Sequence, residues 1–140
     1  MEQKKATCQI IRPSKHFDGK QGLTYFEGIA SETVGSSGIC MHMVTIPPHA
    51  KAKAHLHEHH ETAIYVLKGE GQMWYGDNLS EHMIIREGEF LYIPAGVPHC
   101  PANLTDSEVI AVLARTDPNE QESVVPLPEL DKLIDHLFDK

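Results

Sequence analysis

Hydrophobic and polar residues alternate along most of this chain in short runs. The runs are rich in β-branched, aromatic and aliphatic residues, and turns containing glycine or proline separate them. Regular spacing of such runs is typical of an antiparallel β-sandwich or barrel. The pattern predicts strands at Thr7–Ile11, Leu23–Ile29, Ile39–Ile46, Ala52–His57, Thr62–Leu67, Gly71–Tyr75, His82–Ile85, Phe90–Ile93 and Val109–Ala114.

The end of the chain has a different pattern. In Glu129–Phe138 the apolar residues recur every three or four positions, which predicts an α-helix, and Pro128 suits its first turn. The preceding segment, Asp117–Pro126, is expected to be extended. We therefore expect residues 1–116 to form a barrel with an N-terminal strand extension. Residues 117–140 would form a tail and a helix that packs on the barrel or on a dimer partner.

The composition indicates where the protein is located and which classes of partner it does not bind. The 140 residues suit one domain with a hydrophobic core. A net charge of −8 without a basic cluster argues against nucleic acid and anionic membrane as partners. No apolar run approaches the roughly 20 residues of a membrane helix, and the first residues do not resemble a secretory signal. Because the three cysteines are odd in number and widely spaced, we expect a reducing, cytoplasmic location.

Histidines are concentrated in one segment. Five of the ten lie within the twelve residues from His49 to His60, and Glu61 follows at once. A further histidine, His99, comes later in a turn that contains Pro94, Gly96 and Pro98. Neutral imidazole and carboxylate are the usual ligands of a borderline divalent metal. The simplest interpretation is one metal held by ligands from two distant segments.

The spacing within each segment suits this interpretation. In a strand, His55 and His57 would lie on the same face, roughly 6.5–7 Å apart at the backbone, so both imidazoles could reach one ion. Glu61 opens the next predicted strand and could face His57 across the hairpin. The prolines around Gly96 make the second segment stiff, which would deliver His99 inward. We expect His59 and His60 in the hairpin turn.

Both segments resemble motifs of the cupin superfamily. The second motif of that family is G-x5-P-x-G-x2-H-x3-N, and this chain matches every spacing with Gly88, Pro94, Gly96, His99 and Asn103. The first motif is G-x5-H-x-H-x3-4-E-x6-G, and its metal-binding core is matched by His55, His57 and Glu61. The chain departs from the first motif in two places: His49 replaces the first glycine, and seven residues separate Glu61 from Gly69.

The resemblance implies an all-β fold, the cupin double-stranded β-helix or jelly-roll-like barrel of a small single-domain protein, with a short C-terminal helix. It also implies the metal ligands His55, His57, Glu61 and His99 inside the barrel. Counting back six residues from Gly69 reaches Thr62, a poor ligand. A one-residue bulge near Thr62 would turn Glu61 inward. Otherwise Glu61 could act as a base beside a metal held by three histidines and water.

The expected cofactor is one divalent transition metal per chain: Fe, Mn, Ni, Cu or Zn. The leading hypothesis is a small metalloenzyme that acts on an oxygen-rich small molecule, because cupin relatives include isomerases, dioxygenases, decarboxylases and lyases. Two alternatives remain open: a non-catalytic, metal-dependent small-molecule binding module, and a metal that is mainly structural. We expect a homodimer, because the exposed sheet edges of a short barrel need cover.

Overall fold

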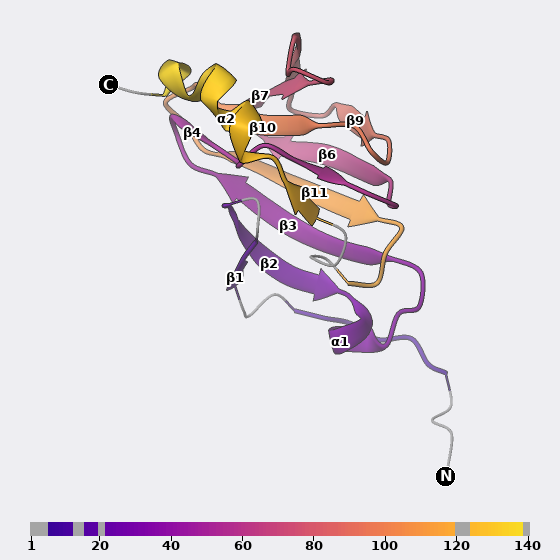
Figure 1. The fold of residues 1–140 in the computed structure, drawn as a ribbon. Helices are drawn as coiled ribbons and strands as arrows, with labels where there is room; N and C mark the ends of the chain where they lie inside the picture. The colour runs from indigo at the N-terminus through magenta and orange to yellow at the C-terminus, as the bar shows by residue number, and fades with distance from the viewer. Residues whose placement is uncertain (1–5, 13–15, 20–21, 120–123, 139–140) are drawn as a thin grey trace.

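A computed structural model describes residues 6–12, 16–19, 22–119 and 124–138 of the chain (Figure 1). The strands are β1 His16–Asp18, β2 Thr24–Ile29, β3 Cys40–Ile46, β4 Ala50–Lys51, β5 His55–His57, β6 Thr62–Lys68, β7 Glu70–Tyr75, β8 Glu81–Arg86, β9 Phe90–Ile93, β10 His99–Asn103, β11 Val109–Arg115 and β12 Val124–Pro126. The helical segments are α1 Ser31–Val34, α2 Pro128–Ile134 and a 3-10 turn, η1 Asp135–Leu137. In the part of the chain described, neither helix is long and apolar enough to cross a bilayer.

The strands form two antiparallel sheets. The order in the first sheet is β1-β2-β3-β11-β6-β9, and the order in the second is β12-β5-β10-β7-β8, with β4 also paired to β10. This arrangement confirms the predicted all-β jelly roll with a short C-terminal helix. No strand ladder joins the two sheets within the described residues, so the barrel expected from the sequence is not closed.

The core lies between the sheets because alternate residues of each strand point inward. In β11 the inward residues are Val109, Ala111, Leu113 and Arg115. In β3 they are Cys40, His42, Val44 and Ile46. The aliphatic members of both sets belong to the main hydrophobic cluster, and the ends of the two strands bring polar side chains into the interior.

One predicted strand is wrong. Residues 7–11 form no strand, and Ile10 is 75% exposed. A strand needs a partner for its backbone groups, and the edge of β2 is paired instead with β1, at His16–Asp18. The sequence also did not predict β10 or β12. Both segments contain proline. They are strands because their backbones pair with neighbouring strands: β10 lies between β5 and β7, and β12 pairs with the outer edge of β5.

The extra residue between Glu61 and Gly69 is accommodated at Leu67. There the pairing of β6 with β11 shifts by one position, whereas the pairing from Thr62 to Val66 is regular. The bulge suggested near Thr62 is therefore wrong. As a result the inward side chain at the start of β6 is that of Thr62, which is 1% exposed.

The C-terminal helix packs on the outer side of the second sheet (Figure 1). Ile134 is buried there against Ala54 and Cys100. Asp131 accepts hydrogen bonds from the Ala54 amide and from Lys51 Nζ, both at 2.8 Å. The helix thus covers the outer face of the strands that carry the histidines.

Candidate metal site

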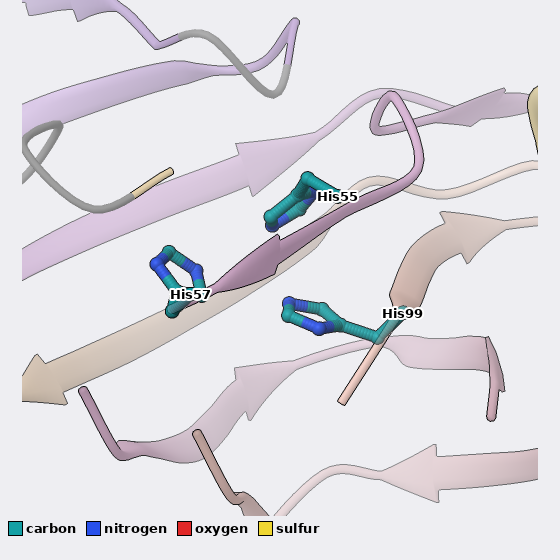
Figure 2. Close-up of side chains that lie close together, drawn as sticks. All are labelled: His55, His57 and His99. Carbon is teal, nitrogen blue, oxygen red and sulfur yellow. The ribbon is translucent and has the colours of Figure 1, made fainter. Parts of the chain in front are cut away.

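Three histidines from two strands form a cluster in the interior (Figure 2). His55 and His57 come from β5, and His99 of β10 is paired directly with His55. The distances between ring centroids are 5.2 Å for His55 and His57, 4.3 Å for His55 and His99, and 5.5 Å for His57 and His99. One possible ligand atom from each residue lies within 4.8 Å of the others. The structure thus brings together the three histidines that the sequence singled out.

Backbone carbonyls orient two of the rings. His55 Nδ1 lies 2.6 Å from the Lys53 carbonyl oxygen, and His99 Nδ1 lies 2.9 Å from the Val97 carbonyl oxygen. Since a carbonyl oxygen only accepts, the proton of each neutral ring is on Nδ1. The lone pair is then on Nε2, which leaves that nitrogen able to bind a metal.

His57 has no such partner. Both of its ring nitrogens are buried without a hydrogen bond in the structure. A buried polar group without a partner is destabilising, and such groups are rare in folded proteins. A divalent transition metal at the cluster would give one of these nitrogens a partner. The donor set and this unsatisfied side chain therefore fit a metal.

The three rings are neutral, as metal binding requires. Burial, followed by the positive charge of Arg115, lowers the pKa of His57 to about 2. Burial also lowers the pKa of His99 to about 4, and it holds the pKa of His55 well below its ordinary value. Protons therefore do not compete for these nitrogens near neutral pH.

Glu61 lies outside this cluster. Its side chain is exposed, and its carboxylate accepts a hydrogen bond of 2.6 Å from the Tyr92 hydroxyl. Within the described residues, the group that could hold a metal consists of the three histidines alone. A role of Glu61 as the fourth ligand, or as a base beside the metal, stays a prediction.

The sequence analysis did not identify Arg115. This arginine is the last residue of β11, and its side chain is buried, with 6% exposed. Its Nε donates a hydrogen bond of 3.1 Å to Thr62 Oγ1, and its guanidinium also hydrogen-bonds with Tyr25. The alternation of the strand could have revealed it. Arg115 continues the series of inward residues Val109, Ala111 and Leu113, but the predicted strand ended one residue earlier, at Ala114. The positive charge of Arg115 lowers the pKa values of His55, His57 and His99.

An internal cavity of about 70 Å³ adjoins the cluster. His55, His99 and Arg115 contribute to its wall. Most of the remaining wall is apolar, and no aspartate or glutamate belongs to it. A ligand in this cavity could contact His55, His99 and Arg115 together.

Four other histidines lie outside the cluster. His59 is exposed in the turn after β5, and His60 Nδ1 lies 3.1 Å from an Asp117 carboxylate oxygen. His49 lies at the surface, 2.6 Å from Asp106. His42 faces the interior from β3 and accepts a hydrogen bond of 3.0 Å from the Gly28 amide. None of these four belongs to the cluster.

Comparison with known proteins identifies the family. The profile of the cupin domain matches residues 42–114, which span β3 to β11. The chain belongs to the cupin family. Its sequence has no match among functionally curated proteins. The family match therefore establishes the fold. The function has to be inferred from the residues of the site.

Several solved structures are similar in fold at low sequence identity. The oxalate decarboxylase of Lactobacillus farciminis, in a formate complex, has a TM-score of 0.68 and 19% identity over 90% of this chain and 39% of its own. A putative sugar phosphate isomerase from Acidithiobacillus ferrooxidans has a TM-score of 0.58 and 21% identity over 71% of this chain and 65% of its own. Drosophila melanogaster CENP-C, bound to CAL1, has a TM-score of 0.58 and 17% identity over 72% of this chain and 75% of its own.

Proposed function

We propose that His55, His57 and His99 bind one divalent transition metal, and that the protein is a small metalloenzyme acting on an oxygen-rich small molecule. The observation that carries this proposal is the arrangement of three buried, neutral imidazoles around one point, with His57 lacking any other partner. Three protein ligands with further positions left open are typical of catalytic rather than structural metal sites.

The chain's own groups would have distinct tasks. The backbone carbonyls of Lys53 and Val97 hold two imidazoles in the ligating tautomer. The apolar wall of the cavity would limit access of water to a bound molecule. When bound, the metal would polarise a substrate oxygen as a Lewis acid, or support oxygen chemistry if it is iron. An isomerase, dioxygenase or lyase reaction would fit, and two of the solved relatives bear the names of a decarboxylase and an isomerase.

The test is to load the protein separately with Fe(II), Mn(II), Ni(II), Cu(II) and Zn(II). Each form is then screened with hydroxy-ketones, diketones, catechols and small oxo acids by oxygen uptake and product analysis. Turnover that requires the metal and is lost in His99→Ala would support the proposal. Absence of metal binding by the unaltered protein would overturn it.

A second candidate is a metal-dependent binding module without catalysis. One observation favours it: the cavity wall contains no carboxylate that could serve as a general base. Among the structural relatives, CENP-C is seen bound to another protein. Tight, metal-dependent binding of a small molecule without turnover under any metal would select this alternative.

We further propose a cytoplasmic homodimer. The three cysteines, all within the described residues, form no disulfide: Cys8 is exposed, and Cys40 and Cys100 are buried. The outer face of the first sheet carries an apolar patch that we call the β6–β9 patch. It consists of Tyr65, Leu67, Phe90 and Tyr92. Contiguous exposed apolar surface of this kind marks an interaction site.

The patch is continuous because its members lie on neighbouring strands. Tyr65 is paired with Phe90, and their rings are 4.8 Å apart. Phe90 is 82% exposed on the edge strand β9. A homodimer through this face would bury these rings. Light scattering should show a dimer at micromolar concentration, and Phe90→Glu should shift it to a monomer with unchanged metal content. A monomeric unaltered protein would contradict the proposal.

A further inference from the structure

The cavity beside the histidine cluster extends along the strands. Both ends of β11 contribute to its wall, with Arg115 at one end and Val109 at the other. The six steps between these residues span about 20 Å of a strand. Because its volume is only about 70 Å³, the cavity is long and narrow.

The polar groups of the wall are gathered at one end. His55 and His99 are paired with each other there, and the charge of Arg115 acts on the pKa of both. Tyr25 belongs to the same end, since its hydroxyl group forms a hydrogen bond with Arg115. A metal at the histidines would therefore lie at the polar end of the cavity.

The opposite end is apolar. The pairing of β7 with β10 puts Tyr75 beside His99 and leaves Gly71 at the other end of the ladder. A Cβ atom added at Gly71 would lie 3.8 Å from a methyl carbon of Val109, so these two residues line this end from opposite sheets. The walls between the two ends are formed largely by aliphatic side chains such as Val66.

One further polar residue of the wall does not change this picture. Gln72 is exposed to the other side of the second sheet, where its Oε1 lies 2.7 Å from His82 Nε2. A hydroxyl or charged group of a ligand near Gly71 would lose its hydrogen bonds with water and would meet aliphatic side chains instead, which is costly. A hydrocarbon group would be stabilised there.

The volume limits the length of such a group. An apolar cavity of about 150 Å³ accommodates a six-carbon ring such as benzene. On that scale, a cavity of about 70 Å³ has room for about three carbon atoms.

We propose that the ligand of this site is a short aliphatic compound, whose oxygen-bearing head binds at the histidines and whose unbranched tail of about three carbons lies in the cavity and points towards Gly71. This inference rests on the proposed metal site and names the class of molecule that it takes. Polyhydroxylated compounds such as sugars are excluded by the same wall, because their hydroxyl groups would be buried without partners.

The first test uses the unaltered protein loaded with Zn(II) and a series of straight-chain hydroxamates, whose heads bind metals through two oxygens. Titration calorimetry should show about fourfold tighter binding for each added CH2 from acetohydroxamate to butanohydroxamate, since burial of one CH2 contributes about 0.8 kcal/mol. Octanohydroxamate should gain nothing further, because the cavity is then full. Equal affinity for all members, a gain that continues to eight carbons, or binding of none of them would overturn the inference while the metal remains bound. Absence of metal binding would overturn both proposals.

A matched pair of ligands tests the polarity of the wall. In 3-hydroxypropanohydroxamate a hydroxyl group replaces the terminal methyl group of butanohydroxamate, so the two have the same number of heavy atoms. The hydroxylated compound should bind at least about tenfold more weakly. Equal affinity for the pair would show that the tail remains in water, and the inference would be wrong.

The third test shortens the cavity at its apolar end. Gly71 and Met73 are the buried positions of β7, and a Cβ at Gly71 would make ordinary contacts, 3.6 Å from the Ala102 carbonyl oxygen and 3.8 Å from Val109. Gly71→Ala should therefore fold, and it should reduce the preference for butanohydroxamate over acetohydroxamate by at least about fourfold. Gly38→Ala, at an exposed glycine with nothing within 4 Å of the added carbon, is the control.

Both glycine variants should keep the metal content and the acetohydroxamate affinity of the unaltered protein. A misfolded variant would lose these as well, so the ratio of the two affinities separates a shorter cavity from damage. An unchanged ratio in a folded Gly71→Ala protein would overturn the inference. If that variant does not fold, the matched pair of ligands on the unaltered protein decides the matter.

Discussion

Arg115 and Thr62 are joined by a hydrogen bond of 3.1 Å between the inner ends of β11 and β6. Thr62 stands at the position where the spacing to Gly69 in the cupin motif places a carboxylate ligand. In this chain a hydroxyl group therefore faces the interior, and a guanidinium lies beside it. At this position of the motif, Arg115 therefore has a neutral hydroxyl group as a hydrogen-bond partner.

This relationship predicts the effect of restoring a carboxylate. Thr62→Glu should bind divalent metal more tightly than the unaltered protein, by at least about tenfold, because a negative charge beside the histidines favours a cation and can also pair with Arg115. Thr62→Gln has the same size without the charge and serves as the control. Competition with a chelator gives both affinities. Equal metal affinity of the two variants would show that residue 62 does not face the metal.

Glu61 gives a separate prediction. Glu61→Gln should retain the metal content of the unaltered protein, because the Glu61 carboxylate is exposed and bound to Tyr92. Tyr92→Phe, which removes only the donor hydroxyl, is the companion variant. Elemental analysis of both proteins decides the matter. A sharp loss of metal in Glu61→Gln alone would show that Glu61 is the fourth ligand that the sequence motif implied.

Each of the two segments of the histidine cluster could be predicted from the sequence because its geometry is local. His55 and His57 share a face in any strand, and His99 follows a turn fixed by two prolines. The orientation of Glu61 could not be predicted in this way. It depends on where β6 accommodates one extra residue, and pairing with β11 and β9 places the irregularity at Leu67 rather than near Thr62.

Long-range contacts explain the other differences. The inward position of Arg115 depends on the place of β11 between β3 and β6, where Arg115 is paired with Cys40 on one side and Thr62 on the other. Residues 7–11 have a strand-like composition, but no strand of the described chain pairs with them. Strand formation by a short segment requires a partner, and the sequence of the segment does not reveal whether one is available.

Stability of the metal-free protein should decrease in mild acid. Burial lowers the pKa of His42 and of His99 from 6.5 to about 4. Below 6.5 the unfolded chain binds protons at these residues and the folded chain does not, so the free energy of unfolding falls as the pH drops from 6.5 towards 4. Each histidine contributes at most about 1.4 kcal/mol per pH unit. Urea unfolding at pH 7.5, 6 and 5 measures the effect, and a constant unfolding free energy would contradict the prediction.

The helix α2 should stabilise the fold without taking part in metal binding. Asp131→Asn weakens the contacts with the Ala54 amide and Lys51 and should lower the unfolding free energy by about 1–3 kcal/mol. Asp106→Asn alters an exposed carboxylate that contacts His49 and should change stability by less than about 0.5 kcal/mol. Urea unfolding compares the two variants, whose metal contents should be equal. Similar stability of both would show that the Asp131 contacts contribute little.

The central claim is that His55, His57 and His99 hold one metal. Its most direct test is elemental analysis of protein purified without chelator and then saturated with Zn(II) or Mn(II), comparing the unaltered chain with His57→Ala, His99→Ala and the control His60→Ala. His60 lies beside Asp117 and outside the cluster. We predict about one metal per chain in the unaltered protein and in His60→Ala, and a sharp loss in the other two variants. Equal metal content in all four proteins, or no bound metal in the unaltered chain, would contradict the account.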